Sequence, residues 1–165
     1  KAHLGRGFKE RLRARLDEKI AGGGLSWRSF EEARVETAIG LRPTGPLAHP
    51  ERDFWPVLNA QTSPGIPFTP AWIGISTTPQ SSERLKRVIF EHTADFFETP
   101  KLSAPSSWWV QWDWMSYWPS AETPTGLAGF TGEQGEALVE RIADWLIALV
   151  PVIEGCIKPE AGDLW

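Results

Sequence analysis

The sequence has a single cysteine, Cys156, among its 165 residues. One cysteine cannot form an internal disulfide, and it excludes zinc sites built from several thiolates. This cysteine usage favours a reducing, cytoplasmic setting. Long apolar runs are missing as well, since no run approaches the roughly 18 residues that a membrane-spanning helix needs. We therefore expect no membrane association.

Motifs that fix a reaction are also missing. No glycine-rich loop both follows a strand and carries the lysine of a phosphate site, and no HExxH segment occurs. Ser76 stands between a predicted strand and a predicted helix, as a hydrolase nucleophile does, but the second glycine of that tight turn is absent. The sequence predicts no cofactor.

Charge is unevenly distributed along the chain. The net charge is -4, yet residues 1–42 hold ten basic and six acidic side chains. A basic segment can meet nucleic acid, but Glu31, Glu32 and Glu36 would repel phosphates on the second predicted helix. A solvated helix face is the simpler interpretation, and nucleic-acid binding is disfavoured.

Residues 108–118, WWVQWDWMSYW, hold five of the ten tryptophans and the only tyrosine. Their alternation predicts a β-strand with one apolar face and one mixed face. The apolar face is expected to lie in the core with Trp108, Trp112 and Trp114. The mixed face, with Trp109 and Asp113, combines aromatic rings with polar groups and is the better candidate for a ligand.

The remaining periodicity predicts a single α+β domain, a small sheet including the tryptophan-rich strand and covered by amphipathic helices. Residues 1–42 are expected to form a helical hairpin, in which a capping box at Ser29 opens the second helix. Seven prolines make residues 43–70 an expected ordered loop. Residues 71–157 read as a strand-helix-strand-helix core. The expected helices are 8–20, 29–40, 81–98 and 132–150, and the expected strands are 71–77 and 107–118.

These features favour a non-catalytic binding or protein-interaction domain of the accessory or inhibitor type. A long ordered loop and an aromatic surface suit recognition of a protein partner. The predicted binding residues are Trp55, Trp109, Gln111, Asp113 and Tyr117.

Two alternatives stay open. The first is a small hydrolase, with or without a metal, in which Asp113, His92 and Asp95 or Glu91 converge in one pocket. The second is a homodimer formed through the N-terminal helices. A metal or general-base site could use His92 with Asp95 and Asp113. The loop segment His49-Pro50-Glu51-Arg52-Asp53 could also bind a cation, but the adjacent arginine opposes it and a turn is the simpler interpretation.

Overall fold

The structure is a computed structural model that describes residues 2–33, 36–61, 71–119 and 129–161. Its centre is a five-stranded sheet in the order β1-β2-β3-β4-β5, in which every neighbouring pair is antiparallel. The strands are β1 (Trp27–Ala33), β2 (Glu36–Pro43), β3 (Phe54–Gln61), β4 (Ala71–Thr77) and β5 (Trp109–Trp114). The α-helices are α1 (Ala2–Gly23), α2 (Glu83–His92) and α4 (Gly132–Ala161). The predicted α+β class is confirmed.

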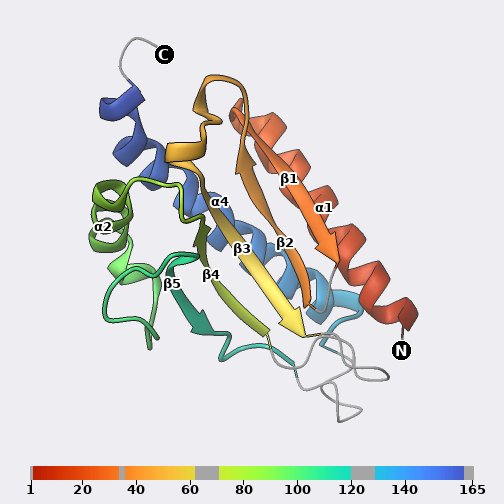
Figure 1. The fold of residues 1–165 in the computed structure, drawn as a ribbon. Helices are drawn as coiled ribbons and strands as arrows, with labels where there is room; N and C mark the ends of the chain where they lie inside the picture. The colour runs from red at the N-terminus through yellow and green to blue at the C-terminus, as the bar shows by residue number, and fades with distance from the viewer. Residues whose placement is uncertain (1, 34–35, 62–70, 120–128, 162–165) are drawn as a thin grey trace.

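The helices lie against one face of the sheet, which we call the inner face (Figure 1). Helix α4 crosses behind the strands, α1 runs beside it next to β1, and α2 lies at the β5 end. The core between helices and sheet is apolar and almost fully buried; its members include Leu12, Leu16, Ile39, Leu41, Leu58, Ile75, Ile142, Leu146 and Ile153. Among the described residues, no helix is both long and apolar enough to cross a membrane.

Helix α1 matches its predicted apolar stripe and extends beyond it at both ends. Leu12 and Leu16 are fully buried, because α1 packs on α4 and β1 of the same chain. The apolar side of α1 is thus covered by α4 and β1 of the same chain. Across the seam, Glu140 of α4 accepts hydrogen bonds from Arg15 Nε at 2.7 Å and Lys19 Nζ at 2.8 Å.

The predicted helix at 29–40 is wrong, since β1 and β2 form an antiparallel hairpin there. Ser29 does not cap a helix: its hydroxyl donates to Asp17 at 2.5 Å and lies 3.3 Å from Arg13 Nη2, both on α1. In β2 the buried residues Thr37, Ile39 and Leu41 alternate with the residues of the other face. A tertiary contact and a buried strand face therefore override the local capping pattern.

The predicted loop at 43–70 is wrong over 54–61, where β3 forms the centre of the sheet. Proline is disfavoured in central strands because it lacks an amide donor. Pairing between β2 and β3 ends at Gly40 and Val57, so Pro56 lies just beyond it, where β3 has no partner on that side. Between β2 and β3 the chain makes two 3₁₀ turns, at 45–47 and 50–52. Residues 62–70 lie outside the described residues.

The strand at 71–77 is confirmed, and the tryptophan strand is shorter than expected at 109–114. These two strands are neighbours but antiparallel, so the right-handed crossover of a parallel pair does not arise. The helix expected at 81–98 ends at His92 and is followed by a 3₁₀ turn at Ala94–Phe96. The last helix continues through Pro151, where the sequence predicts an end or kink, to Ala161.

Candidate functional site

The face of the sheet opposite to α1 and α4 is rich in aromatic side chains. Strand register places one row of outer-face residues across all five strands, namely Phe30, Gly40, Val57, Gly74 and Trp112. Large rings flank this row on either side. We call the set Phe30, Trp55, Trp72, Trp109, Trp112 and Trp114 the outer aromatic face.

Two glycines let these rings lie directly on the backbone of the sheet. A Cβ atom at Gly74 would stand 2.5 Å from the Gln111 carbonyl oxygen and 2.9 Å from the Trp109 ring. A Cβ atom at Gly40 would collide with the Pro56 carbonyl and stand 3.1 Å from the Phe30 ring. All of these distances are shorter than van der Waals contact, so a side chain at either position would push the neighbouring strand or the ring away.

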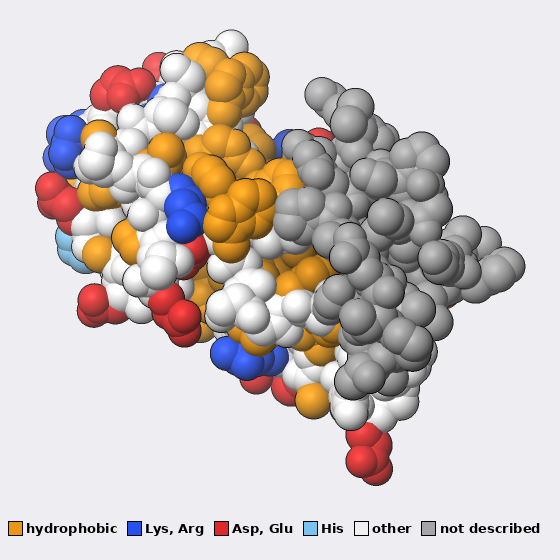
Figure 2. Space-filling view, turned by 90° about the horizontal axis from the view of Figure 1, so that it is seen from below, with side chains coloured by type: hydrophobic (Ala, Val, Ile, Leu, Met, Phe, Trp, Pro, Cys, Tyr) orange, Lys and Arg blue, Asp and Glu red, His pale blue; other side chains and the backbone are white. Residues whose placement is uncertain are grey.

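Three tryptophans form an edge-to-face cluster on β4 and β5. The Trp114 ring lies 5.8 Å from the Trp72 ring and 5.3 Å from the Trp112 ring, at interplanar angles of 81° and 87°. Trp114 remains 44% exposed, and Trp108, just before β5, is 59% exposed. Hydrophobic side chains also gather into a patch on the lower surface of the molecule (Figure 2). Exposed aromatic patches of this kind mark binding surfaces.

The prediction that Trp108, Trp112 and Trp114 face the core is wrong. The inner face of β5 instead carries Gln111 and Asp113, each only 4% exposed, opposite Ile75 and Ile73 of β4. A register shift between Ile75 and Ser76 then brings Trp109 onto the outer face. Alternation alone predicts two faces but does not say which one the helices cover.

The side chains of Gln111 and Asp113 bind residues 99–102, which follow α2 and lie along the free edge of β5. The Gln111 side chain donates to Leu102 O and accepts from Leu102 N, both at 2.8 Å. The Asp113 carboxylate accepts from Thr99 N at 2.8 Å and from Thr99 Oγ1 at 2.7 Å. Lys101 N donates to Trp112 O at 3.0 Å. These bonds satisfy the buried polar groups and shield the edge of the sheet from pairing with other strands.

A cavity of about 290 Å³ opens on the outer aromatic face. Phe30 and Trp55 supply its aromatic walls, and Glu32, Asn59 and Ser76 supply its polar groups. Phe30 and Trp55 are only 5% and 8% exposed, so the rings are fixed by their packing with Val57 and Trp109.

Tyr117 lies in a different depression, on the helix side of β5. This cavity of about 140 Å³ is lined by Asp113, Glu98 and Arg141 among others. The Arg141 guanidinium lies 3.6 Å from the centre of the Tyr117 ring. Burial raises the pKa of the Tyr117 hydroxyl, and the Arg141 charge partly offsets this rise. Of the five predicted binding residues, the structure therefore brings Trp55 and Trp109 together on one face of the sheet and places Gln111, Asp113 and Tyr117 on the other side.

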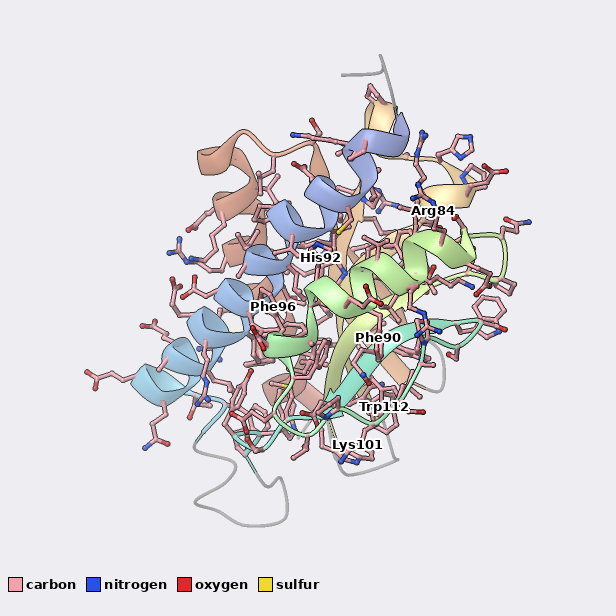
Figure 3. The ribbon with its side chains drawn as sticks, turned by 90° about the vertical axis from the view of Figure 1, so that its left-hand side faces the viewer. Arg84, Phe90, His92, Phe96, Lys101 and Trp112 are labelled. Carbon is pink, nitrogen blue, oxygen red and sulfur yellow. The ribbon has the colours of Figure 1, made fainter. Side chains whose placement is uncertain are left out.

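His92 and Asp113 are not neighbours. His92, at the end of α2, lines a groove against α4 that also contains Cys156, and its Nδ1 lies 2.8 Å from Val88 O. Figure 3 shows His92 between α2 and α4, well away from Trp112 on β5. Asp95 is exposed on the 3₁₀ turn. In the described part of the chain, no three His, Cys, Asp or Glu side chains are placed to hold a metal ion.

Comparison of the chain with protein-family models, with curated proteins and with solved structures finds no match in any of the three. The site is therefore described by its own geometry. Sequence reasoning missed Phe30, Glu32 and Arg42, because residues 1–42 were interpreted as a helical hairpin. The alternation of Thr37, Ile39 and Leu41 with Ala38, Gly40 and Arg42 is the signal that identifies the strand.

Proposed function

We propose that this chain is a non-catalytic protein-interaction domain that binds a partner protein through its outer aromatic face. The observation that carries the proposal is the Trp72, Trp112 and Trp114 cluster, which leaves large rings accessible on a sheet face opposite to the helices. Tryptophan is among the residues that contribute most binding energy to protein interfaces when it is centred in a well-packed patch.

The arrangement of polar groups supports binding rather than catalysis. Asp113, the carboxylate that a hydrolase would use, already accepts two hydrogen bonds from Thr99 and is 4% exposed. A general base needs to reach the proton of its substrate at hydrogen-bond distance, and this carboxylate is engaged with its own chain. The binding residues in this proposal are Trp55 and Trp109 from the sequence prediction, joined by Trp72, Trp112 and Trp114.

Replacement of one exposed ring, Trp114, and one half-buried ring, Trp72, tests the proposal. Proteins captured from source cells by the intact domain are quantified by mass spectrometry and compared with those captured by the Trp72→Ser, Trp114→Ser double variant. A specific partner should be lost by about tenfold or more, since each buried interface tryptophan contributes at least about 2 kcal/mol. The purified partner should then show the same loss in titration calorimetry.

Phe96→Ser is the matched control. Phe96 is a half-buried aromatic on the helix side, where it contacts Trp145 at a ring distance of 6.4 Å. This variant should keep the partner. Equal capture by the intact domain and the double variant, with both folded by circular dichroism, would contradict the proposal.

A further inference from the structure

Arg42 already places a guanidinium group on the aromatic walls of the outer-face cavity. Its Cζ lies 4.3 Å from the centre of the Trp55 ring and 4.9 Å from that of Phe30. Both distances are within the roughly 6 Å over which a cation is attracted to a ring face. The two rings therefore present faces that accept a planar cation, and Figure 1 places their strands, β1 and β3, on either side of β2.

Glu32 is the only charged residue that lines the cavity among the described residues. Its Oε1 lies 3.4 Å from Arg42 Nη2, a long contact for an ion pair, and the Glu32 side chain is 48% exposed. No ion pair between described residues uses its second oxygen, Oε2. The cavity thus combines aromatic walls with a carboxylate that accepts one long hydrogen bond from Arg42 through Oε1.

The size of the cavity indicates what can enter it. A volume of about 290 Å³ is at the lower limit of pockets that hold drug-sized ligands, which start at roughly 300 Å³. It is large enough for one long side chain. Ser76, whose hydroxyl donates to Trp108 O, and Asn59 add polar side chains to the lining. A guanidinium has five N–H donors in one plane, whereas an ammonium is a compact point charge that stacks less well.

We propose that this cavity binds an arginine side chain of the partner protein, with Glu32 as its counter-ion and Phe30 and Trp55 as its stacking walls. This inference rests on the proposed function, because it names the group that the partner inserts into the outer aromatic face. Arg42 has the same chemistry from within the chain and competes for Glu32 and for the two rings.

Small capped amino acids test the proposal on the intact domain. The probes are N-acetyl-arginine methylamide and its uncharged analogue N-acetyl-citrulline methylamide, each titrated while tryptophan fluorescence is followed. The arginine probe should bind with a dissociation constant of roughly millimolar strength, as expected for one side chain. The citrulline probe should bind about tenfold more weakly, because it lacks the charge that Glu32 and the rings recognise.

Two charge variants separate the site from general charge effects. Glu32→Gln should weaken arginine binding about tenfold, and Glu31→Gln, on the same strand but on the opposite face, should leave it unchanged. Arg42→Gln should tighten binding, because it removes the internal competitor. Equal binding of arginine and citrulline, equal effects of the two glutamate variants, or no arginine binding to either the native domain or Arg42→Gln would overturn the proposal.

The two proposals can fail separately. A partner that is lost on replacement of Trp72 and Trp114 but unaffected by Glu32→Gln would retain the interaction surface and refute the arginine pocket. A partner that is unaffected by the tryptophan variants would refute the proposed surface itself, whatever the probes show.

Discussion

Gly74 gives the sharpest test of how the outer aromatic face is built. It lies in the middle of β4, in register with Trp112 of β5, and its backbone angle is not one that requires glycine. The constraint comes from its neighbours: an alanine Cβ would stand 2.5 Å from the Gln111 carbonyl and 2.9 Å from the Trp109 ring. Ordinary van der Waals contact begins at 3.4 Å. Strands β4 and β5 would have to separate, or the Trp109 ring would have to move.

We expect Gly74→Ala to destabilise the fold by about 1–3 kcal/mol, the usual cost of inserting a methyl group into a fully packed site. For a domain of this length each kcal/mol corresponds to about 2–4 °C in the melting temperature, so Tm should fall by about 2–12 °C. Part of the cost is displacement of Trp109, which should also shift the tryptophan fluorescence maximum to the red.

The assay is thermal unfolding followed by circular dichroism, with Gly155→Ala as the matched control. Gly155 is exposed in α4, and an added Cβ meets no atom within 4 Å. Alanine in a helix interior is favoured over glycine by about 0.5–1 kcal/mol, so the control should raise Tm. A Gly74→Ala variant as stable as the native chain would refute the close packing of β4 against β5.

Two further predictions concern Asp113 on the inner face of the sheet and Glu140 between α1 and α4. Asp113→Asn should lower the free energy of unfolding, measured by urea titration, by about 1–3 kcal/mol, because the buried carboxylate accepts two hydrogen bonds from Thr99 and the amide loses part of that bonding. As a control, Asp95→Asn at an exposed position should stay within about 0.5 kcal/mol of the native chain. A larger loss for Asp95→Asn than for Asp113→Asn would contradict the structural role of Asp113. Hydrogen bonds from Arg15 and Lys19 lower the pKa of Glu140 from 4.5 to about 2, so its ion pairs stabilise the fold above pH 4.5 and this contribution is lost as the pH falls towards 2. Glu140→Gln should flatten the acid limb of stability measured from pH 6 to pH 2, more at low salt than at high salt because the pair is exposed.

Much of the helical layer could be predicted because its signals are local. Leu12 and Leu16 recur at helical spacing with charged residues between them, and both are fully buried in α1. The same holds for Ile142 and Leu146 in α4. Periodicity of this kind depends only on which side of one helix is apolar, and a single sequence is sufficient to show it.

The first three strands could not be predicted in the same way, because their identity depends on distant partners. Ser29 has the spacing of a helix cap, but its hydroxyl contacts Asp17 and Arg13 of α1. Pro56 disfavours a central strand, because proline has no amide donor. It is tolerated here because the pairing of β2 with β3 ends beside it, which the sequence alone does not show. At Ser29 a tertiary contact outweighs the local preference, and at Pro56 the end of strand pairing removes the need for an amide donor.

The candidate site was predicted only in part, for a related reason. Trp55 and Trp109 were identified by residue type, which does not depend on the fold. Glu32, which lines the cavity, and Arg42, which lies over its aromatic walls, belong to the segment 1–42 that was interpreted as a helical hairpin. Asp113 looked like a catalytic group because a carboxylate between tryptophans is unusual, yet its bonds to Thr99 are those of a structural residue.

The first and last helices are neighbours in space although the whole sheet separates them in sequence. Arg15 and Glu140, which join them, are 125 residues apart. A ribosome that has released α1 and all five strands still lacks the helix that covers the centre of the inner face. During synthesis, that apolar surface stays uncovered until α4 has been made. Contacts between residues so far apart in sequence slow folding and expose the chain to aggregation. Truncation before Gly132 should accordingly yield insoluble protein rather than a smaller folded unit.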